Sequence, residues 1–465
     1  MRLLRRRRRL LFTGWDSASP QLAFDSFASE LTTLGALRRE GSWGELRSCI
    51  PCITVPAWSS MLGGRDPGEL GLYGFRQRVA GSYLQQSLAD SRSLRHPRAH
   101  DLAGEAGLDS LLMGLPQTWP VQPLRGHLVS GPLTPGLDAV CTWPAVLRQE
   151  LRQLAPGHRF DLPDFRSWDK ARLLQTLIDM AEQQHRVFCH LLRTRPWDFA
   201  LQVHMGLDRA QHVFWSDHDP QHRSHAPGGR WRHALRDFYV MLDRMLGELV
   251  ELAGDYCDVL LVSDHGAKRM DGGICVNEWL WREGWLRLKG DPPPGLLSTL
   301  SGLEVDWAST RAWAEGGYCG RVWLNRMGRE PQGCVSAAEA PALLAELCAG
   351  LKAIRGPEGQ SLPTQVFRPV EIYREVRGLA PDLLVYFGDL HWRAIGTFGH
   401  GRDWSLQNDR GPDGANHAME GLFALREARG RGRGELQGKQ LMDVAPTILN
   451  RLRVPRPAGM QGGAL

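Results

Sequence analysis

Two short stretches, far apart in the chain, place residues that bind divalent metals directly after an apolar run. Asp264 and His265 follow the run 259–262, and Asp208 and His212 follow the run 199–205. Such a continuous apolar run is typical of a strand buried on both faces of a parallel sheet. Ligands bind to open α/β sheets at the carboxyl ends of these strands. Both stretches therefore indicate a metal-dependent hydrolase.

The local spacing allows the side chains of each stretch to converge. Gly266 lets the backbone turn immediately after His265, so neighbouring side chains can reach one ion. Asp208 and His212 are four residues apart, which places both on one face if the chain becomes helical after its strand.

A third carboxylate and a hydroxyl occupy similar positions near the N-terminus. Asp16 follows a predicted strand over residues 10–14, and Thr54 precedes Pro56, which suits the first turn of a helix that residues 63–64 end. Thr54 is therefore expected at a helix N-terminus. A single Asp or Thr at such a position is more often a helix cap or a core hydroxyl. The prediction of a metal site therefore depends on the order in which these residues occur together along the chain.

The remaining elements predict an α/β fold with a largely parallel central sheet and helices on both faces. Residues 1–465 are expected to form a single domain, in which residues from about 75 to 165, rich in Pro, Gly and Arg, form an irregular cap or lid. Residues 17–20 supply cap and first-turn residues for a helix to about Leu37. The other predictions are strands near 45–49, 320–324, 383–387 and 421–425, a helix over 168–192 capped by Ser167, and a surface linker at 290–295.

Charge and hydropathy restrict the location and the partners. The formal net charge is +5, but Arg2 and residues 5–9 carry six positive charges, so the rest of the chain is close to neutral. This arginine run could contact nucleic acid or anionic lipid, although a solvated edge before the first strand is the favoured interpretation. No apolar run reaches the roughly 18 residues of a membrane span. The apolar residues after the arginines are too few for a signal peptide, so a cytoplasmic location is expected.

The nine cysteines fit reduced thiols better than a disulfide framework. Cys49 and Cys52 form a CxxC motif, but it follows a predicted strand and does not begin a thioredoxin-like helix, so a redox role is not favoured. The segment from Cys52 to Pro56 also lacks the Cys-x-Pro-x-Arg pattern of sulfatases with a modified cysteine.

Five motifs in order along the chain resemble the alkaline phosphatase superfamily. They are Gly14-Trp15-Asp16, residues 51–58 around Thr54, Asp208-x-x-x-His212, residues 263–266 and a late His417. The nearest branch is the type I phosphodiesterase/nucleotide pyrophosphatase group, with its predicted phosphohydrolase and phosphomutase relatives. Segments 115–120, 320–330, 380–385 and 443–449 also resemble this family, so the likeness extends over nearly the whole chain.

The resemblance implies a site for two divalent metal ions. One ion would be held by Asp16, Thr54, Asp264 and His265, and the other by Asp208, His212 and His417. Mixed imidazole and carboxylate ligands suit Zn²⁺, with Mn²⁺ as the alternative. Thr54 would be the nucleophile and would carry a phosphoryl group before water or an acceptor alcohol removes it. His417 is preferred to His391 and His400 because residues 416–423 precede a strand, as the late histidine of the family does.

The expected substrate is a small phosphate ester, cleaved as a phosphodiester, pyrophosphate or phosphomonoester. A phosphotransferase or phosphomutase of the same superfamily is the alternative enzyme, and an anion-binding protein that uses the arginine run is the non-catalytic alternative. Asp217, His218, Asp219, His222 and His225 could hold a third metal, but a solvated loop is favoured. Ser17 and residues 63–64 depart from the family pattern. The sequence does not identify the side chain that binds the non-bridging phosphate oxygen, which is the contact that would distinguish monoester from diester substrates.

Overall fold

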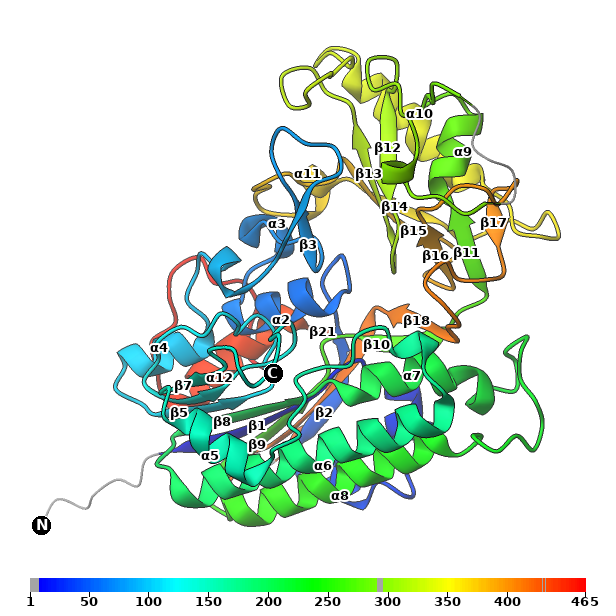
Figure 1. The fold of residues 1–465 in the computed structure, drawn as a ribbon. Helices are drawn as coiled ribbons and strands as arrows, with labels where there is room; N and C mark the ends of the chain where they lie inside the picture. The colour runs from blue at the N-terminus through cyan, green and yellow to red at the C-terminus, as the bar shows by residue number, and fades with distance from the viewer. Residues whose placement is uncertain (1–7, 291–295, 429, 431) are drawn as a thin grey trace, which may run out of the picture.

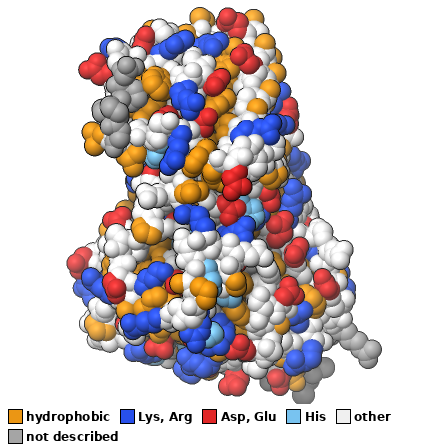
Figure 2. Space-filling model, turned by 90° about the vertical axis from the view of Figure 1, so that its right-hand side faces the viewer, with side chains coloured by type: hydrophobic (Ala, Val, Ile, Leu, Met, Phe, Trp, Pro, Cys, Tyr) orange, Lys and Arg blue, Asp and Glu red, His pale blue; other side chains and the backbone are white. Residues whose placement is uncertain are grey.

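The computed structural model describes residues 8–290, 296–428, 430 and 432–465. Two lobes are stacked on each other (Figure 1), and the outline of the molecule narrows between them (Figure 2). Most of the predicted arginine run (residues 1–7) and of the predicted linker (291–295) lies outside the described residues. Within the described part of the chain, no helix combines the length and the apolar composition that crossing a membrane requires.

The lower lobe is built on a ten-stranded sheet, as the α/β prediction required. Its order is β20 (Gly434–Glu435), β2 (Ser42–Arg47), β19 (Glu420–Arg426), β9 (Cys257–Val262), β1 (Arg9–Trp15), β8 (Phe199–His204), β5 (Ser110–Met113), β6 (Gly126–Val129) and β7 (Thr142–Trp143), with β21 (Lys439–Gln440) beside β2. Strands β9, β1, β8, β5 and β6 are parallel, whereas β19 and β7 are antiparallel to their neighbours. The three central strands, β9, β1 and β8, run in the same direction, so their carboxyl ends lie at one edge of the sheet.

Helices cover both faces of this sheet and bury its apolar side chains. One face packs against α1 (Thr32–Glu40), α5 (Leu147–Leu154), α6 (Lys170–Thr194), α7 (Gly206–His218) and α8 (Ala234–Ala253). The other packs against α2 (Thr54–Gly63), α4 (Ala99–Glu105) and α12 (Val444–Leu452). Gly64 ends α2 at a φ of 59°, a left-handed conformation that glycine adopts easily.

The upper lobe is formed mainly by residues 272–409 and has its own core. Its four-stranded antiparallel sheet has the order β12 (Ala312–Glu315), β13 (Gly320–Leu324), β15 (Leu383–Tyr386) and β14 (Gln365–Phe367). A smaller sheet contains β16 (Trp392–Ile395), β11 (Gly272–Cys275) and β17 (Trp404–Ser405), and α9 (Val276–Arg282), α10 (Ala340–Ala353) and α11 (Pro369–Ile372) flank these sheets. The hairpin β3 (Arg76–Arg78) and β4 (Gln86–Leu88) reaches this lobe, and α3 (Pro67–Leu70) lies below it. The pair β10 (Gly266–Arg269) and β18 (Ala415–Ala418) lies between the lobes.

The stretch from 75 to 165 is not wholly a cap. Strands β5, β6 and β7 come from it and belong to the central sheet, where β5 pairs with β8. These strands are short and are surrounded by Pro and Gly residues, so the hydrophobic periodicity of the sequence did not predict them. The division of the chain into one domain with an insertion remains a prediction.

Two smaller predictions about helices need correction. The predicted helix up to Leu37 is two elements, η1 (Gln21–Ser26) and α1, because the Asp243 carboxylate of α8 accepts hydrogen bonds from the amides of Thr33 and Leu34 and starts a new helix there. Helix α6 is capped by Asp169, which accepts from the amides of Ala171 and Arg172, and not by Ser167.

Candidate metal centre

The predicted ligands meet at the carboxyl edge of the three central strands. Asp16 directly follows β1, Asp208 lies in the first turn of α7 after β8, and Asp264 and His265 follow β9. All four side chains are buried. The order β9-β1-β8 makes these strands neighbours, so their ends bring the four residues together.

The first predicted ligand set is assembled. His265 Nε2 lies 3.3 Å from Asp264 Oδ2 and 3.9 Å from Asp16 Oδ1. The ligand atoms of these three residues all lie within 4.8 Å of one another. Thr54 Oγ1, at the start of α2, is 3.5 Å from His265 Nε2. The hydroxyl therefore adjoins this cluster.

The second set is arranged around Asp208, although the group whose ligand atoms all lie within 4.8 Å of one another there is Asp208, His417 and His265, with His212 beside it. Asp208 Oδ1 lies 3.5 Å from Nε2 of His212 and 3.5 Å from Nε2 of His417. The rings of His265 and His417 stack with centroids 3.8 Å apart, so the two sets are adjacent. His417 enters from β18, a strand that no local pattern predicts.

The polar atoms that face this centre are buried without a hydrogen-bond partner. They are Asp16 Oδ1, Asp208 Oδ1, His212 Nε2, Asp264 Oδ2 and His417 Nε2. An unsatisfied buried polar atom costs about 1–3 kcal/mol, so five in one place need a common partner. Two divalent cations fit these carboxylate and imidazole donors.

Hydrogen bonds on the opposite side of each ligand fix its orientation. Trp58 Nε1 donates to Asp16 Oδ2 at 2.7 Å, and the Ser17 amide donates to Asp264 Oδ1 at 3.1 Å. His417 Nδ1 lies 2.7 Å from the Cys52 carbonyl oxygen, which leaves Nε2 free to bind. Such outer partners set the ring orientation and the basicity of a metal ligand.

Sequence reasoning missed Asp413, which has this orienting role for His212. Asp413 Oδ1 lies 2.9 Å from His212 Nδ1, and its Oδ2 accepts from Arg166 Nε at 2.6 Å. Tyr318 was also missed, and its ring stacks on that of His417 at 3.6 Å. Asp413 is four residues before His417 and Tyr318 is two residues before the 320–330 segment, but both lie in irregular stretches, where no periodicity indicates which side chains face the site.

Burial and mutual repulsion perturb the titration of the cluster. Burial, with the charge of Asp208, raises the pKa of Asp16 well above its usual range, and burial with the charge of Asp16 does the same for Asp264. Although burial lowers the pKa of His212, the carboxylates of Asp413 and Asp208 raise it to about 10. The metal-free cluster therefore holds protons that a cation would displace.

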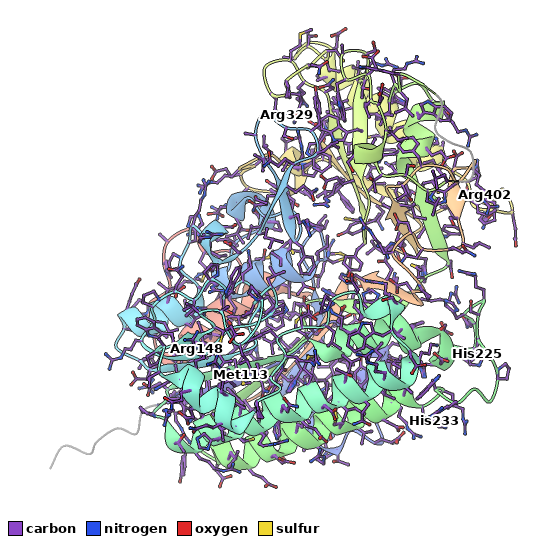
Figure 3. All side chains as sticks on the ribbon, in the orientation of Figure 1. Met113, Arg148, His225, His233, Arg329 and Arg402 are labelled. Atoms are coloured by element: carbon purple, nitrogen blue, oxygen red, sulfur yellow. The ribbon has the colours of Figure 1, made fainter. Side chains whose placement is uncertain are left out.

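Other candidate residues lie apart from this centre. Among the described residues, the groups able to hold a metal do not include His218, His222 or His225. Figure 3 shows His225 at the edge of the lower lobe, on the connection between α7 and α8. Burial raises the pKa of Cys49 to about 12, which disfavours the thiolate that a redox CxxC motif uses.

Comparisons with known proteins agree with this architecture. The family model described as type I phosphodiesterase / nucleotide pyrophosphatase matches residues 10–415. Phosphonoacetate hydrolase from Sinorhizobium meliloti superposes with a TM-score of 0.59 at 17% identity, covering 96% of each chain. Human ectonucleotide pyrophosphatase/phosphodiesterase 5 gives 0.54 at 11% identity, covering 98% of this chain and 97% of that one. A murine form, an inactive threonine-to-alanine variant bound to AMP, gives 0.55 at 10% identity with the same coverage. No curated protein sequence matches the chain.

Proposed function

The chain belongs to the type I phosphodiesterase/nucleotide pyrophosphatase family, whose members are hydrolases of phosphoric esters, and we propose that it acts through Thr54 at a site for two divalent metal ions. The observation that carries this proposal is the convergence of five buried, unpartnered ligand atoms at the carboxyl edge of the central sheet.

We propose that seven residues hold the two ions. Asp16, Thr54, Asp264 and His265 would bind one, and Asp208, His212 and His417 the other; zinc is the favoured metal and manganese the alternative. When bound, such ions lower the pKa of a coordinated hydroxyl and neutralise charge on phosphoryl oxygens.

Thr54 is the proposed nucleophile because of its place in the fold. It is the first residue of α2, where free backbone amides favour an anion, and its hydroxyl lies 3.5 Å from His265 Nε2. Its Oγ1 would form a bond to phosphorus as the ester oxygen leaves, and water would then release the phosphoryl group. The inactive threonine-to-alanine variant of the murine relative supports a threonine in this role.

Metal-loaded protein should hydrolyse p-nitrophenyl esters, and apoprotein should not. The test compares a phosphomonoester with a phosphodiester after loading with zinc or manganese, and it measures nitrophenolate together with the free phosphate released from the monoester or the phosphomonoester released from the diester. An isomer of the substrate, or phosphate transferred to an acceptor alcohol, in place of these hydrolysis products would establish the phosphotransferase or phosphomutase alternative. A metal-loaded sample that cleaves neither ester would contradict the proposed function.

Residues 1–8, which include all of the arginine run except Arg9, are proposed to be dispensable for this activity. Arg9, the last member of the run, donates from Nη2 to the Ala253 carbonyl oxygen at 2.6 Å and lies over the ring of Trp197 at 4.2 Å, so this side chain has a structural use. A cytoplasmic location remains our proposal, supported by nine cysteines that form no disulfide.

A further inference from the structure

A pocket of about 730 Å³ opens between the lobes beside the metal centre, and arginines dominate its charged lining. They are Arg76, Arg166, Arg321, Arg393 and Arg410, against the two carboxylates Glu315 and Asp409. Glu315 is already paired, at 2.8 Å, with Arg321. The pocket therefore has an excess of positive charge.

Two of these arginines are joined to the metal centre through one carboxylate. Arg166 Nε and Arg393 Nη1 donate to Asp413 Oδ2 at 2.6 and 3.2 Å, and Asp413 Oδ1 meets His212. The Arg393 guanidinium also lies 5.8 Å from the ring centre of Tyr318, which stacks on His417. This end of the pocket is therefore next to the predicted ligands.

Asp413 cannot satisfy both guanidinium groups. A single carboxylate oxygen accepts from both arginines, while Arg166 Nη2 and Arg393 Nε are buried without a hydrogen-bond partner. The side chains are 14% and 6% exposed, so solvent screens them weakly. Asp413 is shared between these two largely buried cations, and although Asp409 also acts on Arg393, the arginines of the pocket still outnumber its carboxylates, so positive charge remains that a bound anion would offset.

We infer that the substrate carries a second anionic group, a carboxylate or a phosphoryl group, on the part that extends from the scissile phosphate into this pocket. Arg166 and Arg393 bind it by charge-assisted hydrogen bonds, which are about twice as strong as neutral ones. This inference rests on the proposed function, because it takes the metal centre as the place of the scissile phosphate. It narrows the substrate to phosphate esters with two anionic ends.

The test compares pairs of ligands that differ at the second end, which is anionic in one member of each pair and uncharged in the other. Phosphoglycolate is compared with its uncharged amide, and ethane-1,2-diol bisphosphate with the monophosphate, by calorimetry on zinc-loaded Thr54→Ala protein, which cannot consume them through the proposed nucleophile. At least one charged ligand should bind about 30-fold more tightly than its partner, or roughly 2 kcal/mol. The ligand pair that shows the larger ratio of affinities tells whether the pocket binds a carboxylate or a phosphoryl group.

Substitutions then assign the preference to the two arginines. Arg393→Gln and Arg166→Gln should each reduce the ratio of affinities to about threefold or less, and Arg393→Lys should restore part of it because it keeps the charge. Arg402→Gln is the matched control, since this exposed arginine lies at the rim of the upper lobe (Figure 3) and does not line the pocket. It should leave the ratio unchanged. If Arg393→Gln does not fold, the ratio of affinities measured for Arg166→Gln, at the less buried arginine, tests the assignment.

The measurements distinguish a substrate without a second anionic group from a protein without the proposed hydrolase activity. Equal affinities within both ligand pairs, in a protein whose wild type hydrolyses p-nitrophenyl esters, would overturn the second anionic group and leave the hydrolase intact. A preference that both glutamine variants retain would likewise overturn the assignment to Arg166 and Arg393. A preference lost in these variants without any hydrolysis would support the anion site and contradict the hydrolase.

Discussion

Thr54 is the residue at which covalent and direct hydrolysis differ, because only the covalent route needs a hydroxyl there. Thr54→Ala should keep most of the bound metal, since six other ligands remain, and should lose several orders of magnitude in kcat. Thr54→Ser should retain measurable turnover. Ser60→Ala, which removes another buried hydroxyl of α2, is the control. Near-wild-type kcat in Thr54→Ala would exclude the nucleophile assignment.

His212 gives the site a predictable dependence on pH. Asp413 and Asp208 raise its pKa to about 10, above the ordinary value of about 6.5. This shift stabilises the metal-free fold below pH of about 6.5, and the contribution is lost as the pH rises through about 10. Metal binding at pH 8 must therefore release the His212 proton.

Asp413→Asn should lower the pKa of His212 and reduce the proton release at pH 8 by about one per chain. Calorimetry of zinc binding in buffers with different ionisation enthalpies measures this number. Asp403→Asn, which alters a surface ion pair with Arg282, should release as many protons as the wild type. Equal release from the Asp413 variant would show that Asp413 does not control the titration of His212.

At the scale of elements, the packing of β1 against α2 sets the position of Asp16. A Cβ atom on Gly14 would lie 2.3 Å from the ring of Trp58, the residue whose Nε1 holds Asp16. Gly14→Ala should therefore cost about 1–3 kcal/mol of unfolding free energy and weaken metal retention. Gly35→Ala in α1, where the nearest atom is a flexible arginine tip at 3.4 Å, should be neutral or stabilising. Urea unfolding checks both, and equal stability of both variants would contradict the packing argument.

Buried strands and their ends were the elements that the sequence predicted best. The runs 10–14, 199–205 and 259–262 became β1, β8 and β9, because continuous apolar runs and the residues directly after them are local signals. Pairing between strands is not local, so the strands at 320–324 and 383–387 were predicted without revealing that they form a separate antiparallel sheet. For the same reason Asp413, Tyr318 and the arginine pocket could not be predicted.

At the scale of the whole molecule, metal binding is expected to stabilise the chain. Asp16, Asp208 and Asp264 lie buried together at the edge of the central sheet. Burial, with the charge of Asp16, raises the pKa of Asp264 well above its usual value in the metal-free protein. Ionising this carboxyl therefore costs folding free energy, and stability falls as the pH rises above its unfolded pKa of about 3.9.

Asp264→Asn should be more stable than the wild type without metal and less stable than the wild type when metal is added. Without metal at pH 8 the variant should melt at the higher temperature, because it has no buried carboxylate to ionise at this position. With zinc at about 100 times its Kd the wild type should gain roughly 2.7 kcal/mol, and the variant, which has lost a charged ligand, should gain less and melt first. Thermal unfolding followed by circular dichroism, with and without chelator, measures both orders. A wild type that melts at one temperature regardless of metal would refute a built-in metal centre, because ions held by buried ligands of the folded state cannot leave its stability unchanged.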